Sequence, residues 1–199
     1  MARKLSPIVV ALFLVGLTVA PAASAIGVRA AQAVDSRAAA SSSSPIAPPS
    51  VCPDQEDLGA PAGVQEQAMS CMVDFARRQA GLSELLDAPA LAQSAEDKSL
   101  DVLRCDEFSH FACGRDFTFW MKETGYTSAP CWRVGENLAW GTGEYGSVRS
   151  IFIAWMRSSG HRANILGDFT ESGLSLHVGT LEGQAGTRIW AEHFGSHCE

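Results

Sequence analysis

The chain has 199 residues, of which 46% are hydrophobic, and its formal net charge is -7 at pH 7. An acidic chain without a stripe of Lys and Arg lacks the electrostatic footprint of a nucleic-acid-binding protein, and anionic membrane surfaces do not attract it from a distance. We therefore expect no nucleic-acid partner.

The first residues predict export. Arg3 and Lys4 form a short positive region, residues 5–20 are uncharged and mostly apolar, and residues 23–25 read Ala-Ser-Ala, which suits a signal-peptidase site. Residues 1–25 are predicted to be a cleaved signal peptide, so that the mature protein is secreted and has no membrane span. An uncleaved membrane anchor is the alternative, because residues 5–28 carry no charge and reach the length of a span.

Residues 26–51 are predicted to be a disordered linker. Ala, Ser and Pro dominate this segment, and it holds no aromatic residue. Such a composition buries too little apolar surface to offset the entropy lost on ordering. The remaining residues, 52–199, are long enough for one domain with a substantial core.

All six cysteines lie within residues 52–199: Cys52, Cys71, Cys105, Cys113, Cys131 and Cys198. An even number in an exported chain predicts three disulfides, and no two cysteines have the Cys-x-x-Cys spacing of a metal cluster. Locality favours Cys105 with Cys113, which would close a short loop around His110. Cys52 with Cys71 is the next most local choice and leaves Cys131 with Cys198, but the sequence leaves these two pairings open.

The apolar pattern predicts helices in the first two thirds of the domain. Residues 65–80 carry apolar side chains at helical spacing and precede Gly81, a typical C-terminal cap. Pro89 fits the first turn of a second helix, and a short third helix is expected over residues 116–125. Ser147 fits the N-cap of a fourth helix, whose apolar residues recur at helical spacing.

Towards the C-terminus the apolar period changes to two. Residues 174–178 and 189–193 alternate in polarity around a turn at residues 183–186, so they are expected to form a β-hairpin. Residues 133–140 are expected to form another strand, interrupted at residues 135–137. Helices early and antiparallel strands late predict an α+β or α-β-α sandwich fold rather than a parallel doubly wound sheet.

Residues 141–146 match the G-x-G-x-x-G pattern of dinucleotide-binding loops. The preceding segment, however, carries Arg133, Glu136 and Asn137 where such a site has a buried apolar strand, and no second βαβ unit follows. We therefore interpret residues 141–146 as a glycine turn between a strand and a helix.

Three separated segments place residues of metal-ligand or acid–base type beside glycine or another small residue: Phe108-Ser109-His110, Gly135-Glu136-Asn137 and Ser159-Gly160-His161-Arg162. Their shared character suggests one site assembled from distant parts of the chain. The common hydrolase motifs G-x-S-x-G and H-E-x-x-H are absent.

The order and spacing of these segments resemble the CAP superfamily, also called SCP or SCP/TAPS, which includes cysteine-rich secretory proteins, antigen 5 and plant pathogenesis-related proteins. The likeness is to its secreted bacterial branch. It runs from about Cys71 to the C-terminus and includes Trp155, residues 163–166, Trp190 and residues 194–195. The resemblance implies a disulfide-stabilised α+β domain, a CAP-type α-β-α sandwich with a central antiparallel sheet.

The resemblance also implies a cavity lined by two histidines and two glutamates that can hold a divalent ion. The matching residues here are His110, Glu136 and His161, whereas Ser158 occupies the position of the second glutamate. Three ligands of this kind suffice for a zinc ion with an open water position. The alternative is a buried, hydrogen-bonded cluster of the same side chains without metal. Four residues are expected to support the cavity: Asn137, Ser158, Arg162 and Asn164.

Three classes of function are compatible with these features. The first, suggested by the resemblance, is a non-enzymatic secreted module that binds a sterol, a fatty-acyl lipid, or a component of an envelope or host surface. The second is a metal-dependent hydrolase or protease in which a His₂Glu site activates water. The third is a structural or signalling domain that acts through protein contacts. We rank them in this order, assign no catalytic residue and expect no cofactor besides one divalent metal ion.

Overall fold

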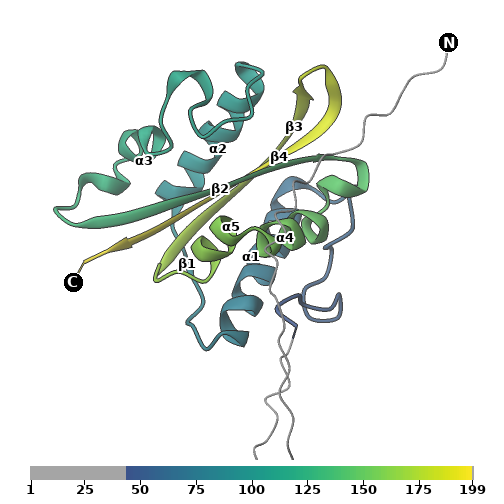
Figure 1. Cartoon of the computed structure of the whole chain (residues 1–199), viewed down its shortest axis with the longest axis horizontal. Coiled ribbons are helices and arrows are strands. Elements are labelled where there is room, and N and C mark those ends of the chain that lie inside the picture. Colours follow the sequence, from purple (N-terminus) through teal and green to yellow (C-terminus); the bar gives the residue numbers. More distant parts are fainter. Residues whose placement is uncertain (1–43, 199) are drawn as a thin grey trace, which may run out of the picture. The chain divides into compact units, whose positions relative to one another are not determined.

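Residues 44–198 of the chain are described by a computed structural model (Figure 1). In this part of the chain the helices are α1 (Ala62–Gln79), α2 (Pro89–Arg104), α3 (Phe119–Glu123), α4 (Val148–Arg157) and α5 (Ser159–Ile165). The strands are β1 (Leu86–Asp87), β2 (Trp132–Thr142), β3 (Glu171–Leu181) and β4 (Gln184–His197). The predicted signal peptide and most of the predicted linker lie outside the described residues.

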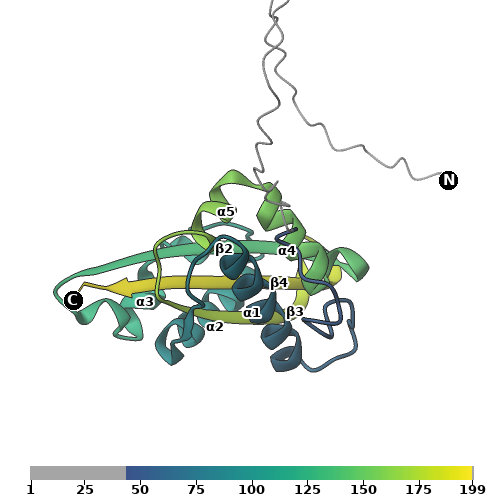
Figure 2. The same cartoon turned by 90° about the horizontal axis from the view of Figure 1, so that it is seen from below.

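The four strands form one sheet in the order β1-β3-β4-β2. The long strands β2, β3 and β4 are antiparallel, and the two-residue β1 runs parallel to the start of β3. Figure 2 shows β2 and β3 on opposite sides of β4. Apolar residues of α1, α4 and α5 pack on one face of this sheet, and those of α2 pack on the other. The expected α-β-α sandwich is thus confirmed.

The strand β4 supplies alternate residues to the two helical layers. Trp190 and Phe194 are fully buried with the residues of α1 and α4, whereas Ile189 and Ala191 are fully buried with residues of α2. This alternation is the ordinary consequence of the pleat. It places the sequence neighbours Glu192 and His193 in different layers.

The predicted helix boundaries are largely confirmed. α1 ends before Gly81, whose φ of 76° is left-handed, and α2 has Pro89 in its first turn. The Ser147 hydroxyl caps α4 by accepting a hydrogen bond from the Ser150 N–H. Helix α3 starts later than expected because Asp116 accepts the Thr118 N–H in a turn that precedes the helix.

Two expectations for the strands are corrected. β2 is continuous through residues 135–137, because each of these residues pairs with β4 instead of forming a corner. The hairpin turns at Glu182 and Gly183, slightly before the expected residues 183–186, and both turn residues have positive φ, as a type I′ turn requires. Residues 141–146 form the end of β2 and a short 3-10 turn, which confirms their interpretation as a glycine turn.

The structure pairs all six cysteines in the way that locality favours. The bonds join Cys52 with Cys71, Cys105 with Cys113, and Cys131 with Cys198. The first ties the segment before α1 to that helix, the second closes the segment after α2, and the third joins the start of β2 to the end of β4. Among residues 44–198 there is no helix with the length and apolar character of a membrane span.

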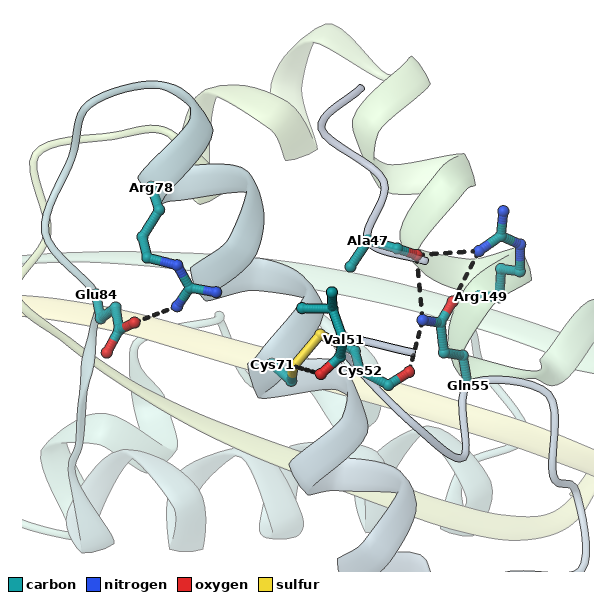
Figure 3. Close-up of a disulfide and its surroundings, with 8 residues drawn as sticks. All are labelled: Ala47, Val51, Cys52, Gln55, Cys71, Arg78, Glu84 and Arg149. Carbon is teal, nitrogen blue, oxygen red and sulfur yellow. Dashed lines mark hydrogen bonds and ion pairs between the residues drawn. A yellow bond between two sulfur atoms is a disulfide. The ribbon is translucent and has the colours of Figure 1, made fainter. Parts of the chain in front are cut away.

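The packed part of the chain begins before the predicted boundary at Cys52. Ala47 is fully buried against α1 and α4, and its carbonyl oxygen accepts hydrogen bonds from Gln55 and Arg149 (Figure 3). The adjacent Cys52–Cys71 bond fixes the same segment on α1 (Figure 3). These contacts order the end of the Ala/Ser/Pro-rich segment despite its composition.

A buried arginine fastens the loop between α5 and β3 to α1. The Arg77 side chain donates to the carbonyl oxygens of Ser83, Ile165, Gly167 and Phe169 at 2.7–2.9 Å. These bonds satisfy the carbonyl group at the end of α5 and carbonyl groups of the irregular segments after α1 and before β3. The guanidinium therefore donates these hydrogen bonds to carbonyl groups and not to a carboxylate.

The carboxyl group of Glu192 lies near Arg77 in the same layer. Glu192 is fully buried, and within the described chain neither of its side-chain oxygens has a hydrogen-bond partner. Burial raises the pKa of this carboxyl well above its ordinary value, and the negative charge of Asp74 raises it further against the opposing effect of Arg77. The group is therefore protonated in the folded protein over much of the pH range in which it would ionise in the unfolded chain.

We predict that Glu192→Gln removes a pH dependence of folding. Because the folded-state pKa is raised, the contribution of Glu192 to stability is complete below its unfolded pKa and is lost as pH rises, by about 1.4 kcal/mol per pH unit until the folded pKa is reached. Chemical denaturation of both proteins from about pH 4 to 8 measures this slope. Parallel pH profiles for the wild type and the variant would contradict the prediction.

Candidate functional site

The site at the β2 edge is centred on one buried carboxylate. Glu136 lies on β2 directly opposite His193 of β4, and its side chain is 1% exposed. Its Oε1 atom lies 2.5 Å from Nδ1 of His110, and its Oε2 atom lies 2.9 Å from Nε2 of His193. A single carboxylate thus joins two imidazole rings.

The ionisation of Glu136 fixes the hydrogen-bond directions. Burial alone would raise the pKa of this carboxyl, but the hydrogen bonds of His110 and His193 and the charge of Lys98 hold it below its ordinary value. An ionised carboxylate only accepts hydrogen bonds, so Nδ1 of His110 and Nε2 of His193 both donate. His110 is left with a free electron pair on Nε2 when its ring is neutral.

His193 continues the network into the α2 layer. Its Nδ1 atom lies 2.6 Å from the hydroxyl of Ser94, which is also 2.9 Å from the carbonyl oxygen of Leu91. When His193 is neutral and donates from Nε2, its Nδ1 atom accepts a hydrogen bond, and the hydroxyl of Ser94 is the donor. Ser94, His193 and Glu136 have the composition of a serine hydrolase triad, but Ser94 and His193 are fully buried, so no substrate reaches the hydroxyl.

Two bonds hold His110 in place from the side of α2. The buried Lys98 ammonium donates to the His110 carbonyl oxygen at 2.7 Å, and the Cys105–Cys113 disulfide closes the segment around it. Burial lowers the pKa of Lys98, against the raising effect of nearby carboxylates that include Glu136. The expected role of this disulfide in closing the His110 loop is confirmed.

A second carboxylate anchors the residues that follow. Asp101 of α2 is fully buried and accepts two hydrogen bonds of 2.9 Å from Arg115 and one of 2.7 Å from the Trp120 indole. These charge-assisted bonds tie the start of α3 and the preceding turn to α2. The His110 segment is therefore fixed on both sides.

His161 approaches the same edge from the opposite layer, on α5. The Asn137 side chain donates to the His161 carbonyl oxygen, and the Asn164 side chain donates to the Glu136 carbonyl oxygen and to Asn137 Oδ1 at 2.9–3.2 Å. Burial lowers the pKa of His161, and the nearby His110 lowers it further. In the described part of the chain, the His161 ring makes no hydrogen bond with Glu136 or His110.

The other predicted supporting residues lie close by but act differently. Arg162 donates to the Met156 carbonyl oxygen and thereby stabilises the corner between α4 and α5. Ser158 forms that corner itself, between the last residue of α4 and the first of α5. Gly135 has a steric role, since a Cβ atom there would lie 3.1 Å from the Phe169 ring and 3.2 Å from Asn164 Oδ1. It lets the Asn164 side chain approach the strand.

An open depression of about 340 Å³ lies in front of this network. Its lining combines polar groups of the network with apolar side chains: His110, Glu136 and Asn164 with Phe117, Val134 and Gly135. The His110 side chain is 52% exposed. Of the two imidazoles bound to Glu136, only that of His110 is accessible to a ligand.

Comparison with known proteins decides the family. The CAP family model, described as the cysteine-rich secretory protein family, matches residues 72–191, which is more than half of the chain. The chain belongs to the CAP family. Curated protein sequences give no significant match to this CAP protein.

Solved structures share the fold. An outer surface protein of Borrelia burgdorferi is 16% identical with a TM-score of 0.54, and the match covers 65% of this chain and 90% of that one. An extracellular SCP-domain protein of Bacillus anthracis is 20% identical with a TM-score of 0.53, covering 67% of this chain and 40% of that one. A cysteine-rich secretory protein of Staphylococcus aureus is 17% identical with a TM-score of 0.50, covering 68% and 39%. This CAP protein therefore spans about two fifths of the last two chains.

The geometry tests how the three predicted ligands fit a metal ion. In this CAP domain each oxygen of Glu136 already accepts one hydrogen bond from an imidazole, so a metal ion bound by Glu136 would have to use the remaining lone pairs of its oxygens. Residues 44–198 contain no group of three or more His, Cys, Asp and Glu side chains placed to hold an ion. His110 does fit, because metal-binding histidines commonly donate their other N–H to a carboxylate. The three-ligand zinc site stays a prediction.

Sequence reasoning missed His193 and Ser94 as members of the network. From the sequence, His193 is expected only to continue the alternating pattern of the hairpin. The signal that could have found it is the same alternation, which puts His193 on the face of Ala191 and Ile189 and therefore into a buried layer. A fully buried imidazole needs polar partners, and Glu136 is the residue opposite it.

We predict the tautomers of the two histidines. Ring nitrogen NMR spectra at about pH 8, above the ordinary pKa of histidine, should show the proton of His110 on Nδ1 and that of His193 on Nε2. Glu136→Gln should abolish this preference at His110 and destabilise the fold by about 1–3 kcal/mol, since an amide cannot accept at both of its atoms. A proton on Nε2 of His110 in the wild type would contradict the proposed network.

Proposed function

We propose that this CAP domain is a secreted, non-enzymatic binding module whose ligand site is the depression at the β2 edge. The observation that carries this proposal is the division of the network into buried and accessible parts. Glu136, His193 and Ser94 satisfy one another inside the protein, whereas the ring of His110, bonded to the same carboxylate, is half exposed at the depression. The three disulfides support secretion, since such bonds persist in oxidising compartments.

The ligand that suits this site best is an amphipathic lipid such as a sterol or a fatty acid. Phe117 and Val134 supply apolar walls, and His110 and Asn164 supply hydrogen-bonding groups. Ligand sites typically combine such walls with a few polar groups, and a volume of about 340 Å³ lies at the small end of their range. The exposed Phe111 beside His110 enlarges the apolar surface for a lipid carried by an envelope or host surface.

Saturable lipid binding is the expected outcome for the purified protein. Fluorescence titration with cholesterol and with palmitate should show binding that survives chelation and moderate salt, because burial of apolar surface is insensitive to screening. His110→Ala should weaken it about tenfold through the loss of one hydrogen bond, and Val134→Asp should abolish it.

His177→Ala is the matched histidine control, because His177 lies on β3 away from the depression. It should bind as the wild type does. Absence of saturation with either lipid, or equal affinities for the wild type and Val134→Asp, would overturn the lipid assignment.

A metal-dependent hydrolase is the second candidate. The specific observation in its favour is the position of His110, whose Nδ1–H is held by a carboxylate while its half-exposed ring lines the depression. This arrangement is typical of a histidine that binds zinc. A bound zinc ion would lower the pKa of a water molecule, and the predicted ligands His110, Glu136 and His161 are the residues of this chain that would hold it.

Zinc titration by calorimetry tests this candidate. Zinc should bind once per chain, and binding should weaken as pH falls through about 6.5, because ligating histidines must be neutral. His110→Ala and His161→Ala should each remove most of the binding, and Ser158→Glu should strengthen it by restoring the family's fourth ligand. Equal zinc binding by the wild type and the double His110/His161 alanine variant would leave the cluster a structural polar network and eliminate the hydrolase.

A further inference from the structure

The outer edge of β3, at the other side of the sheet, is almost entirely unpaired. β1 pairs with only Glu171 and Ser172, and no other strand of the described chain pairs with this edge. The Ser172 carbonyl oxygen accepts the Ala88 N–H, so even-numbered residues of β3 direct their backbone groups outwards. Leu174, Leu176 and Val178 therefore present N–H and C=O groups beyond the end of β1.

This edge forms the floor of a slot between α1 and α2. Two adjoining hollows of about 430 and 440 Å³ share Glu66, Pro89, Ala92 and Leu174 as lining residues, so they form one continuous groove along β3. Helix α1 packs on one face of the sheet and α2 on the other, so the slot continues the plane of the sheet. An additional strand placed there would lie beside β3 as β1 does at its start.

Close packing of α2 against β3 forms one wall of the slot. A Cβ atom at Gly173 would lie 2.0–2.5 Å from backbone atoms of Leu91 and Ala92. The glycine thus allows α2 to lie directly against β3 and to form a wall beside its free edge. Leu86 of β1, beside the start of this edge, is 69% exposed, and Val178, further along β3, is 54% exposed. These side chains offer apolar contact to an added strand.

One acidic side chain already forms a hydrogen bond with a backbone N–H of this edge. Oε1 of Glu66 accepts the N–H of Leu176 at 2.8 Å. Burial raises the pKa of Glu66, against the lowering effect of this hydrogen bond. A carbonyl group of an incoming strand would replace Glu66 at Leu176, and a cationic side chain beside Glu66 would relieve the cost of burying its charge.

The charges of the slot select the occupant. Glu66, Asp87 and Glu96 line it together with His177, whose Nε2 lies 3.9 Å from Glu96, and there is no Lys or Arg among its lining residues. A second copy of this chain would bring the same acidic edge against it, and like charges at an interface are costly. The carboxylate of a fatty acid meets the same repulsion. A positively charged peptide meets complementary charge.

We propose that the slot along β3 binds an extended, lysine- or arginine-containing peptide segment of a partner protein, which joins the sheet as an added strand between α1 and α2. Backbone hydrogen bonds to Leu174 and Leu176 provide the affinity, as in other cases of strand addition. The carboxylates of Glu66, Asp87 and Glu96 select basic side chains. This site lies at the opposite edge of the sheet from the lipid site and does not depend on it.

The test uses a capped fluorescent peptide of alternating lysine and valine. Fluorescence anisotropy should show saturable binding that weakens with salt, and hydrogen exchange should show protection of the Leu174 amide in the complex. A peptide of the same sequence with alternate N-methylated residues cannot donate to the strand and should not bind. The corresponding peptide of glutamate and valine should not bind either.

Gly63→Lys blocks the slot without disturbing the fold. Gly63 lines the slot on α1, and a Cβ atom there meets nothing within 4 Å. The added charge should weaken peptide binding about tenfold or more, because like charges repel at an interface. Glu96→Gln should weaken it about threefold, as expected for an exposed ion pair. The matched control Glu123→Gln, on the exposed surface of α3, should change nothing.

Three results would overturn the proposal: equal binding of the N-methylated peptide, unchanged binding by Gly63→Lys with an unaltered unfolding temperature, or no saturable binding at low salt. Protection of the Leu174 amide that grows with protein concentration in the absence of peptide would assign the slot to a second copy. Displacement of the peptide by palmitate would assign it to a lipid instead.

Discussion

The hydrogen bonds that Glu136 accepts from His110 and His193 are the interaction on which the β2 edge depends. A carboxylate buried to this degree would be protonated if it stood alone, and two N–H donors keep its pKa below the ordinary value. The position of each donor histidine is in turn set by other parts of the fold. The register of β4 places His193 opposite Glu136, and Lys98 with the Cys105–Cys113 bond places His110. Side chains from α2, β2 and β4 thus act as one unit.

The unpaired backbone groups at the two outer edges of the sheet have different hydrogen-bond partners. At β2, α5 covers the edge, and the side chains of Asn137 and Asn164 bond to backbone carbonyl groups of α5 and β2. At β3, among the described residues, the carboxylate of Glu66 accepts the Leu176 N–H, and the rest of the edge beyond β1 lies open between two helices. Inward-pointing charges protect edge strands against aggregation. The same charge gives the β3 edge its preference for cationic partners.

The buried acidic residues in the two layers around β4 also differ in the hydrogen-bond donors that surround them. In the α2 layer Glu136 and Asp101 are supplied with donors and anchor neighbouring segments. In the α1 layer Arg77 donates its hydrogen bonds to carbonyl groups of the loop before β3, and Glu192 is left without a partner among the described residues. A carboxyl group without donors is stable inside a protein only as the neutral acid. Glu136 and Glu192, on neighbouring strands of one sheet, therefore differ in ionisation because their neighbours differ.

The sequence alone determined what depends on local pattern and composition. The periods of 3.6 and two located the main helices and the hairpin, Pro89 and Ser147 marked helix starts, and locality paired Cys105 with Cys113 correctly. It also named His110 and Glu136, because their motifs have a recognisable order. Tertiary structure decided what depends on register. Only the pairing of β2 with β4 brings His193 to Glu136, and only the end of β1 after two residues leaves the β3 edge free. A strand pattern fixes which side chains share a face, but the partner opposite each of them is set by packing across the sheet.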